Sequence, residues 1–94
     1  MIKITMCPTI DMEDICRELG LCKRDFECTQ MVANDSYIIF DCSEERVEEL
    51  SEDLERAKGK GETSYFNRLS NDYALINLLR AQGILDYVLI CVNW

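Results

Sequence analysis

The order of two hydrophobic patterns along the chain limits its fold more than any other feature. Alternating or short apolar runs favour strands, and they occur at residues 1–7, 26–33, 37–40 and 86–93. Apolar residues at spacings of three and four favour amphipathic helices, and they occur at residues 10–19, 44–57 and 63–82. Strands and helices therefore share one short chain, which predicts an α+β fold.

The predicted order of elements, β-α-β-β-α-α-β, is that of a ferredoxin-like fold with a split second crossover. Such a fold has a four-stranded antiparallel sheet with its helices packed on one face. The first and third strands are parallel neighbours, and the last strand pairs with the first. A hairpin is expected over residues 26–40, with Asn34-Asp35-Ser36 as its turn. An irregular segment at 26–33 would leave three strands.

Capping residues predict where the helices begin and end. Thr9 or Asp11 can cap the first helix, and Gly20 can end it. Ser43 can cap the helix at 44–57. Ser70-Asn71-Asp72 either continues or interrupts the helix at 63–82, because these residue types prefer caps to helix interiors.

The length of 94 residues predicts a single domain spanning residues 1–94. A hydrophobic fraction of 48 % with one proline is typical of a globular chain. The longest apolar run, at 87–92, has six residues, whereas a membrane-spanning helix needs about 20. The first residues contain no apolar run long enough for a signal peptide. We therefore expect a cytoplasmic protein.

Cysteine is abundant for this length, with six residues at Cys7, Cys16, Cys22, Cys28, Cys42 and Cys91. An exported chain would pair them as disulfides, whereas a reducing cytoplasm keeps thiols free. Three of them lie in or beside apolar strand-like runs, where a thiol behaves as a small hydrophobic group. Buried free thiols are therefore expected.

Several kinds of active site lack the residues that they need. The chain has no histidine, which excludes Ser-His-Asp chemistry and removes the usual base for a cysteine nucleophile. Five residues separate Cys16 from Cys22 and Cys22 from Cys28, wider than the spacing of paired zinc ligands. Carboxylates abound, but no motif marks one pair as converging in a cleft. We predict no enzymatic activity, no metal and no cofactor.

Negative charge is concentrated in one predicted helix. The chain has 18 acidic and 10 basic residues and a net charge of −8. Residues 41–56 hold eight of these acids and only two bases. Val47, Leu50 and Leu54 form the inward stripe of this helix. The predicted partner-binding residues on its remaining surface are Glu45, Glu48, Glu49, Glu52, Asp53 and Glu55.

Two interpretations of this acidic helix stay open. It is either a solvated surface that keeps a small protein soluble or an anionic surface for a basic partner. Nucleic acids and anionic membranes would repel it. Its carboxylates follow one another at about one per 2.5 Å of helix, between the phosphate spacings of duplex and single-stranded DNA.

The leading hypothesis is a non-enzymatic inhibitor that competes with nucleic acid for the basic channel of a nucleic-acid-binding protein. In size and charge, although not in any motif, the chain is similar to the small acidic inhibitor proteins that phages and mobile elements encode, including some anti-CRISPR proteins. The alternative is a small ligand-binding regulatory domain that acts as a homodimer. Open sheets commonly associate through a face or an edge, and an apolar last strand would suit such a contact.

Overall fold

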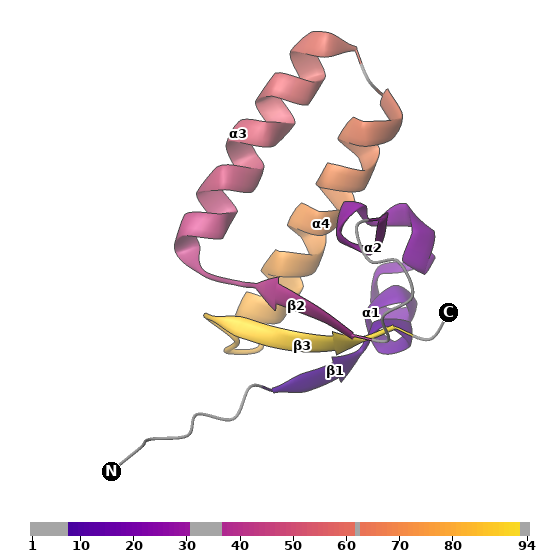
Figure 1. The fold of residues 1–94 in the computed structure, drawn as a ribbon, viewed down its shortest axis with the longest axis vertical. Coiled ribbons are helices and arrows are strands. Elements are labelled where there is room, and N and C mark those ends of the chain that lie inside the picture. The colour runs from indigo at the N-terminus through magenta and orange to yellow at the C-terminus, as the bar shows by residue number, and fades with distance from the viewer. Residues whose placement is uncertain (1–7, 31–36, 62, 93–94) are drawn as a thin grey trace.

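A computed structural model describes residues 8–30, 37–61 and 63–92. The strands are β1 (Thr9–Asp11), β2 (Tyr37–Asp41) and β3 (Tyr87–Cys91). The helices are α1 (Met12–Leu19), α2 (Glu27–Gln30), α3 (Glu44–Lys60) and α4 (Thr63–Ala81), with a 3₁₀ turn at Lys23–Asp25. Figure 1 shows α3 and α4 rising side by side from a small sheet.

The sheet is mixed, and its central strand is the last strand of the chain. Its order is β1-β3-β2. β3 runs parallel to β1, with Ile10 opposite Ile90, and antiparallel to β2, with Ile39 opposite Leu89. The predicted ferredoxin-like fold with a four-stranded antiparallel sheet is therefore wrong, because the described residues form three strands of mixed direction.

The error arises at residues 26–33, where alternation predicted a strand. Glu27–Gln30 instead form α2. The Asp72 carboxylate of α4 accepts hydrogen bonds from the backbone amides of Glu27 (3.0 Å) and Cys28 (3.1 Å), at the start of this helix. A cap supplied by a residue 45 positions away in the sequence leaves no local signal, so the alternation of residues 26–33 did not reveal the helix. The rest of that predicted strand, and its turn, lie outside the described residues.

The first predicted strand, at residues 1–7, also lies outside the described residues. β1 begins at Thr9, directly after Pro8, where the sequence predicted a break. Asp11 then occupies the N-cap position of α1 in an extended conformation, without a side-chain capping bond. Gly20 ends α1 with a left-handed φ of 68°, which confirms the predicted stop.

The long helices α3 and α4 form a hairpin that returns the chain to the sheet. Ser43 caps α3 by accepting from the Arg46 amide at 3.3 Å, as predicted, and Gly61 ends α3 with a φ of 70°. Because the hairpin brings the chain back to its starting end, β3 begins beside the end of β2, where the Cys42 amide donates to the Asp86 carbonyl at 2.9 Å. β3 must therefore run antiparallel to β2.

The core lies between the helices and one face of the sheet. Alternate residues of β2 and β3 point into it, and Ile38, Phe40, Val88 and Ile90 are buried there. α4 contributes Leu75, Ile76 and Leu79, and α1 contributes Met12 and Ile15. These buried residues of α1 and α4 follow the spacing of three and four that predicted both helices. Within the described residues the opposite face of the sheet has no helix over it (Figure 1), and Ile39 there is 72 % exposed.

Candidate interaction surfaces

α3 packs against the core through one stripe of residues and leaves its acidic surface exposed. Leu50 and Ala57 are buried, and Val47 and Leu54 are partly buried against the core. The predicted residues Glu45, Glu48, Glu49, Glu52 and Glu55 are all exposed. Asp53 differs, because its side chain is only 27 % exposed. The structure therefore places all six predicted carboxylates on α3, five of them exposed and Asp53 only partly exposed.

Two of the six predicted residues already have a cationic neighbour on α3. Arg46 pairs with Glu49 at 3.0 Å, and Arg56 pairs with Asp53. In the described part of the chain, no ion pair engages the exposed carboxylates of Glu44, Glu45, Glu48, Glu52 and Glu55. These five carboxylates, called the acidic face below, are the part of α3 most available to a partner.

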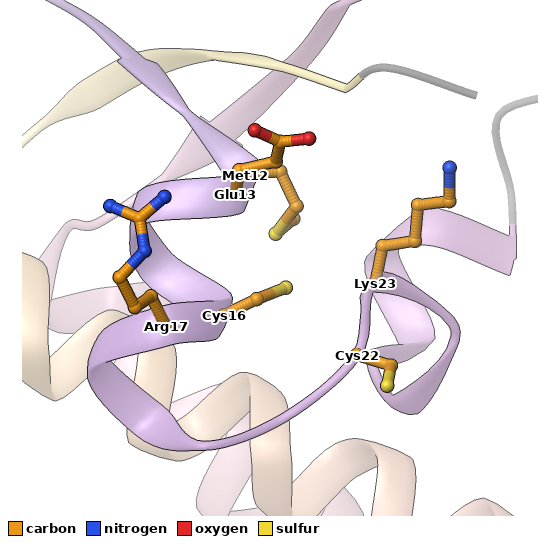
Figure 2. A pocket seen from close by; sticks show the side chains of 6 residues that line it. All are labelled: Met12, Glu13, Cys16, Arg17, Cys22 and Lys23. Carbon is orange, nitrogen blue, oxygen red and sulfur yellow. The ribbon is translucent and has the colours of Figure 1, made fainter.

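A pocket of about 450 Å³ lies between α1 and the segment that follows it (Figure 2). Its lining residues are Met12, Glu13, Cys16, Arg17, Cys22 and Lys23. Burial raises the pKa of the Cys16 thiol, and the neighbouring Cys22 and Asp25 raise it further. Cys16 is therefore a neutral thiol at pH 7, unsuited to act as a nucleophile.

The evenly spaced cysteines of the sequence do not converge. Cys16 and Cys22 line the pocket, whereas Cys28 lies in α2 beside Asp72. Burial and the Asp72 carboxylate both raise the pKa of Cys28, burial more strongly. Over residues 8–30, 37–61 and 63–92, no three histidine, cysteine, aspartate or glutamate side chains are grouped so that they could hold a metal ion.

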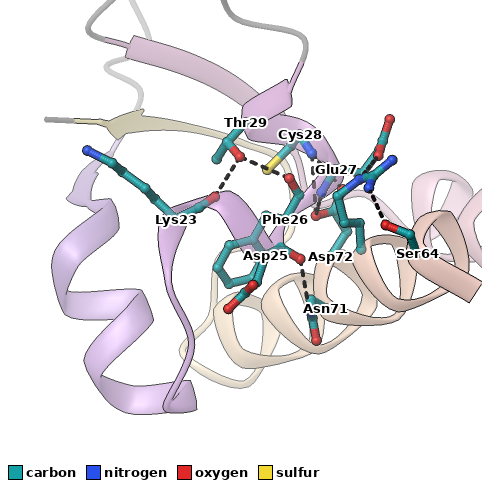
Figure 3. A network of polar contacts seen from close by, with 10 residues as sticks. Lys23, Asp25, Phe26, Glu27, Cys28, Thr29, Ser64, Asn71 and Asp72 are labelled. Atoms are coloured by element: carbon teal, nitrogen blue, oxygen red, sulfur yellow. Dashed lines mark hydrogen bonds and ion pairs between the residues drawn. The ribbon is translucent and has the colours of Figure 1, made fainter. Parts of the chain in front are cut away.

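A polar network joins α2 and the 3₁₀ turn to the middle of α4 (Figure 3). Arg68 pairs with Glu27 at 2.6 Å, and the Asn71 amide donates to the Asp25 carbonyl at 2.7 Å. Asp72 is only 2 % exposed. Burial raises its pKa to about 6, although the amides of Cys28 and Glu27 act in the opposite direction. Because Asn71 and Asp72 bond outward to these elements, they do not interrupt α4.

Sequence reasoning missed two features that the structure makes prominent. One is Asp72, which was noted only as a helix-breaking residue type. The other is the set of residues on the exposed apolar face of the sheet. The sequence predicted association through a sheet face or edge with an apolar last strand, but it did not single out Tyr37 and Ile39 of β2 and Tyr87 of β3. The alternation of Tyr37-Ile38-Ile39-Phe40 is too apolar on both sides to show which residues face solvent.

Comparison with protein-family models, curated proteins and solved structures gives no match for this chain. No helix in the described ranges is long and apolar enough to cross a membrane.

Proposed function

We propose that the chain is a non-enzymatic interaction protein that presents the acidic face of α3 to a basic surface of another protein. One observation carries this proposal: α3 is anchored through a single buried stripe, while the five carboxylates of the acidic face stand exposed without a cationic partner in the described structure. Like charges at helical spacing destabilise a helix, so the arrangement costs stability that a docking function would justify.

A nucleic-acid-binding protein is the most specific partner of this kind. Its binding channel is basic, and a helix with closely spaced carboxylates offers it charges at a density near that of phosphates. The chain would then act as an inhibitor. Phages use small acidic proteins of this type, such as anti-CRISPR proteins, against the defence systems of their hosts. A cytoplasmic location belongs to this proposal, and the five described cysteines are free thiols, as a reducing compartment favours.

The test uses two variants that remove the same amount of charge. The first replaces Glu45, Glu48 and Glu52 of the acidic face with Gln, and leaves Glu49 because Arg46 already pairs with it. The control replaces Glu13, Glu18 and Asp86, which are exposed outside α3, with their amides. Both triples remove three negative charges from the net −8, so they differ only in where the charge is lost.

Each protein is immobilised and exposed at low salt to a cell extract, and bound proteins are eluted with salt and identified. The proposal expects a nucleic-acid-binding protein that the control variant retains, that the α3 variant loses, and that duplex DNA displaces. Equal loss in both triples would mean that only net charge matters and would contradict a specific acidic face. Retention by the α3 variant would contradict the proposal outright.

The pocket beside α1 favours a ligand-binding regulatory domain as a second candidate. Its volume of about 450 Å³ lies within the range of small-molecule sites. Buried, apolar Met12 and the charged side chains of Arg17 and Glu13 line it (Figure 2). A metabolite screen by thermal unfolding tests this candidate. A ligand that raises the melting temperature of the wild type but not of Arg17→Ala would support it, and no response to any metabolite would contradict it.

A further inference from the structure

The apolar face of the sheet is an exposed feature that the proposed role of the acidic face does not explain. Directly paired residues lie on the same face of a sheet, so Tyr37, Ile39, Tyr87, Leu89 and Cys91 share the side that faces away from the helices. Ile39 is 72 % exposed, and Tyr37 and Tyr87 are 52 % and 53 % exposed. This set of five residues is called the open face below.

The open face is uncharged at its centre although the whole chain carries −8. The central strand contributes only Tyr87, Leu89 and Cys91 to it. Two acids flank the open face, Asp11 on β1 opposite Cys91 and Asp41 on β2 opposite Tyr87. They therefore lie at diagonally opposite corners, around an apolar centre formed by Ile39 and Leu89. An apolar centre with a charged rim is the usual anatomy of a protein interface.

We propose that the open face is a self-association surface, on which two copies of the chain pack sheet against sheet about a two-fold axis. A basic partner would be drawn to α3, on the other side of the molecule, and would gain little from this uncharged centre. A second copy instead supplies the same apolar centre, and most closed dimers bury one such surface against itself. Exposed tyrosines are also frequent anchors of interfaces.

The positions of the two acids decide how the sheets can cross. A two-fold axis parallel or perpendicular to the strands places one acid of each copy opposite Tyr37 of the other, where a phenol hydroxyl can donate to the carboxylate. Either diagonal axis would place carboxylate against carboxylate. Packed sheets cross either nearly aligned or at about 90°, and the 90° crossing needs a diagonal axis. The charges therefore select the aligned packing.

The available area sets the expected strength of the dimer. Each half-exposed tyrosine can bury roughly 100 Å², and the whole face with its rim can bury about 500 Å² per copy, near the lower limit for a specific interface. We therefore expect dissociation in the micromolar range, with monomers in dilute solution.

Sedimentation of the full chain over a range of concentrations tests this proposal. The variant Ile39→Lys places a charge in the middle row of the face, beside Leu89, and should weaken dimerisation at least ~10-fold, because a buried unpaired charge is costly. The matched control is Leu85→Lys, since Leu85 is 58 % exposed but precedes β3 and lies outside the paired strands. It should leave the dissociation constant unchanged. Wild type that stays monomeric to about 0.5 mM would overturn the proposal, since a micromolar dimer would then be fully formed.

Thiol reactivity tests the same surface without any substitution. Cys91 lies on the open face and Cys22 lies in the α1 pocket. Alkylation of Cys91 by a maleimide should slow several-fold at concentrations where the dimer forms, and alkylation of exposed Cys22 should not change. If Cys91 is not protected, or if Leu85→Lys weakens association as much as Ile39→Lys does, the open face is not the interface.

Discussion

Asp72 makes the stability of this protein depend on pH in an unusual direction. Its carboxyl group is 2 % exposed, and its pKa is raised from 3.8 to about 6, mainly by burial. A carboxyl group whose pKa is raised by folding stabilises the fold most when it is protonated. The stabilising contribution of Asp72 to the free energy of unfolding is at its maximum below pH ~4. It falls as the pH rises from about 4 to about 6 and is absent at higher pH. The whole loss amounts to about 3 kcal/mol.

The variant Asp72→Asn isolates this effect, because its side chain is neutral at every pH. Its amide keeps one oxygen acceptor, for the backbone amide of Glu27, and loses the second oxygen, which accepts from Cys28. The measurement is urea unfolding followed by circular dichroism at pH 5 and pH 7, above the pI of 4.4. Between these two values the wild type should lose roughly 1 to 1.5 kcal/mol relative to Asp72→Asn. Any constant cost of the substitution cancels in this difference.

The control is Asp86→Asn, which removes one carboxylate from an exposed position beside β3. It shows how much of the pH response comes from the loss of one charge in a chain with net charge −8. If the free energies of unfolding of wild type and Asp72→Asn differ by the same amount at pH 5 and at pH 7, the reasoning is refuted. Asp72 would then be ionised in the fold as easily as in the unfolded chain.

Two further predictions concern the α3–α4 hairpin, and both are read by denaturant unfolding. Gly61→Ala should destabilise the fold by about 1 kcal/mol because φ is 70° at this position. The control Gly59→Ala, inside α3 with open space around it, should stabilise the fold by up to ~1 kcal/mol. Equal effects of the two substitutions would show that Gly61 does not hold a left-handed turn. Leu50→Ala should cost about 2–5 kcal/mol because this side chain is fully buried, whereas Leu85→Ala, at 58 % exposure, should change stability by under about 0.5 kcal/mol.

The elements that were predicted correctly carry their start and stop signals within a few residues of their ends. Ser43 lies at the start of α3 and Gly20 at the end of α1, and both act as the sequence indicated. α2 was missed because the acceptor for its first amides is Asp72, more than 40 residues away. Because α2 was not recognised, the sequence predicted a strand where residues 27–30 form a helix, and the all-antiparallel sheet was predicted from that strand order.

The candidate surfaces were also predictable to different degrees, because some of their features depend on local sequence and others on contacts formed in the folded structure. The exposure of the acids on α3 follows from helical spacing and was foreseen. The sequence did not predict which of these acids form ion pairs. Arg46 and Arg56 each have several acids within reach, and the structure pairs them with Glu49 and Asp53. The open face depends on which side of a sheet the helices cover, and this is a property of the assembled layers.

Partner binding through the acidic face and self-association through the open face should respond to salt in opposite ways, so one salt titration can test the two proposals separately. Contacts between exposed charges weaken when the ionic strength rises from about 50 to about 500 mM, because the screening length falls well below 10 Å. Two copies of a chain with net charge −8 repel one another, so the same change should maintain or strengthen association through the uncharged open face. If one salt titration weakens both partner binding and dimerisation, then the dimer is held by charges rather than by Ile39 and Leu89. Since α3 and the sheet lie on different sides of the core (Figure 1), a dimer formed through the open face would leave two acidic faces exposed, and a partner with two basic sites could engage both.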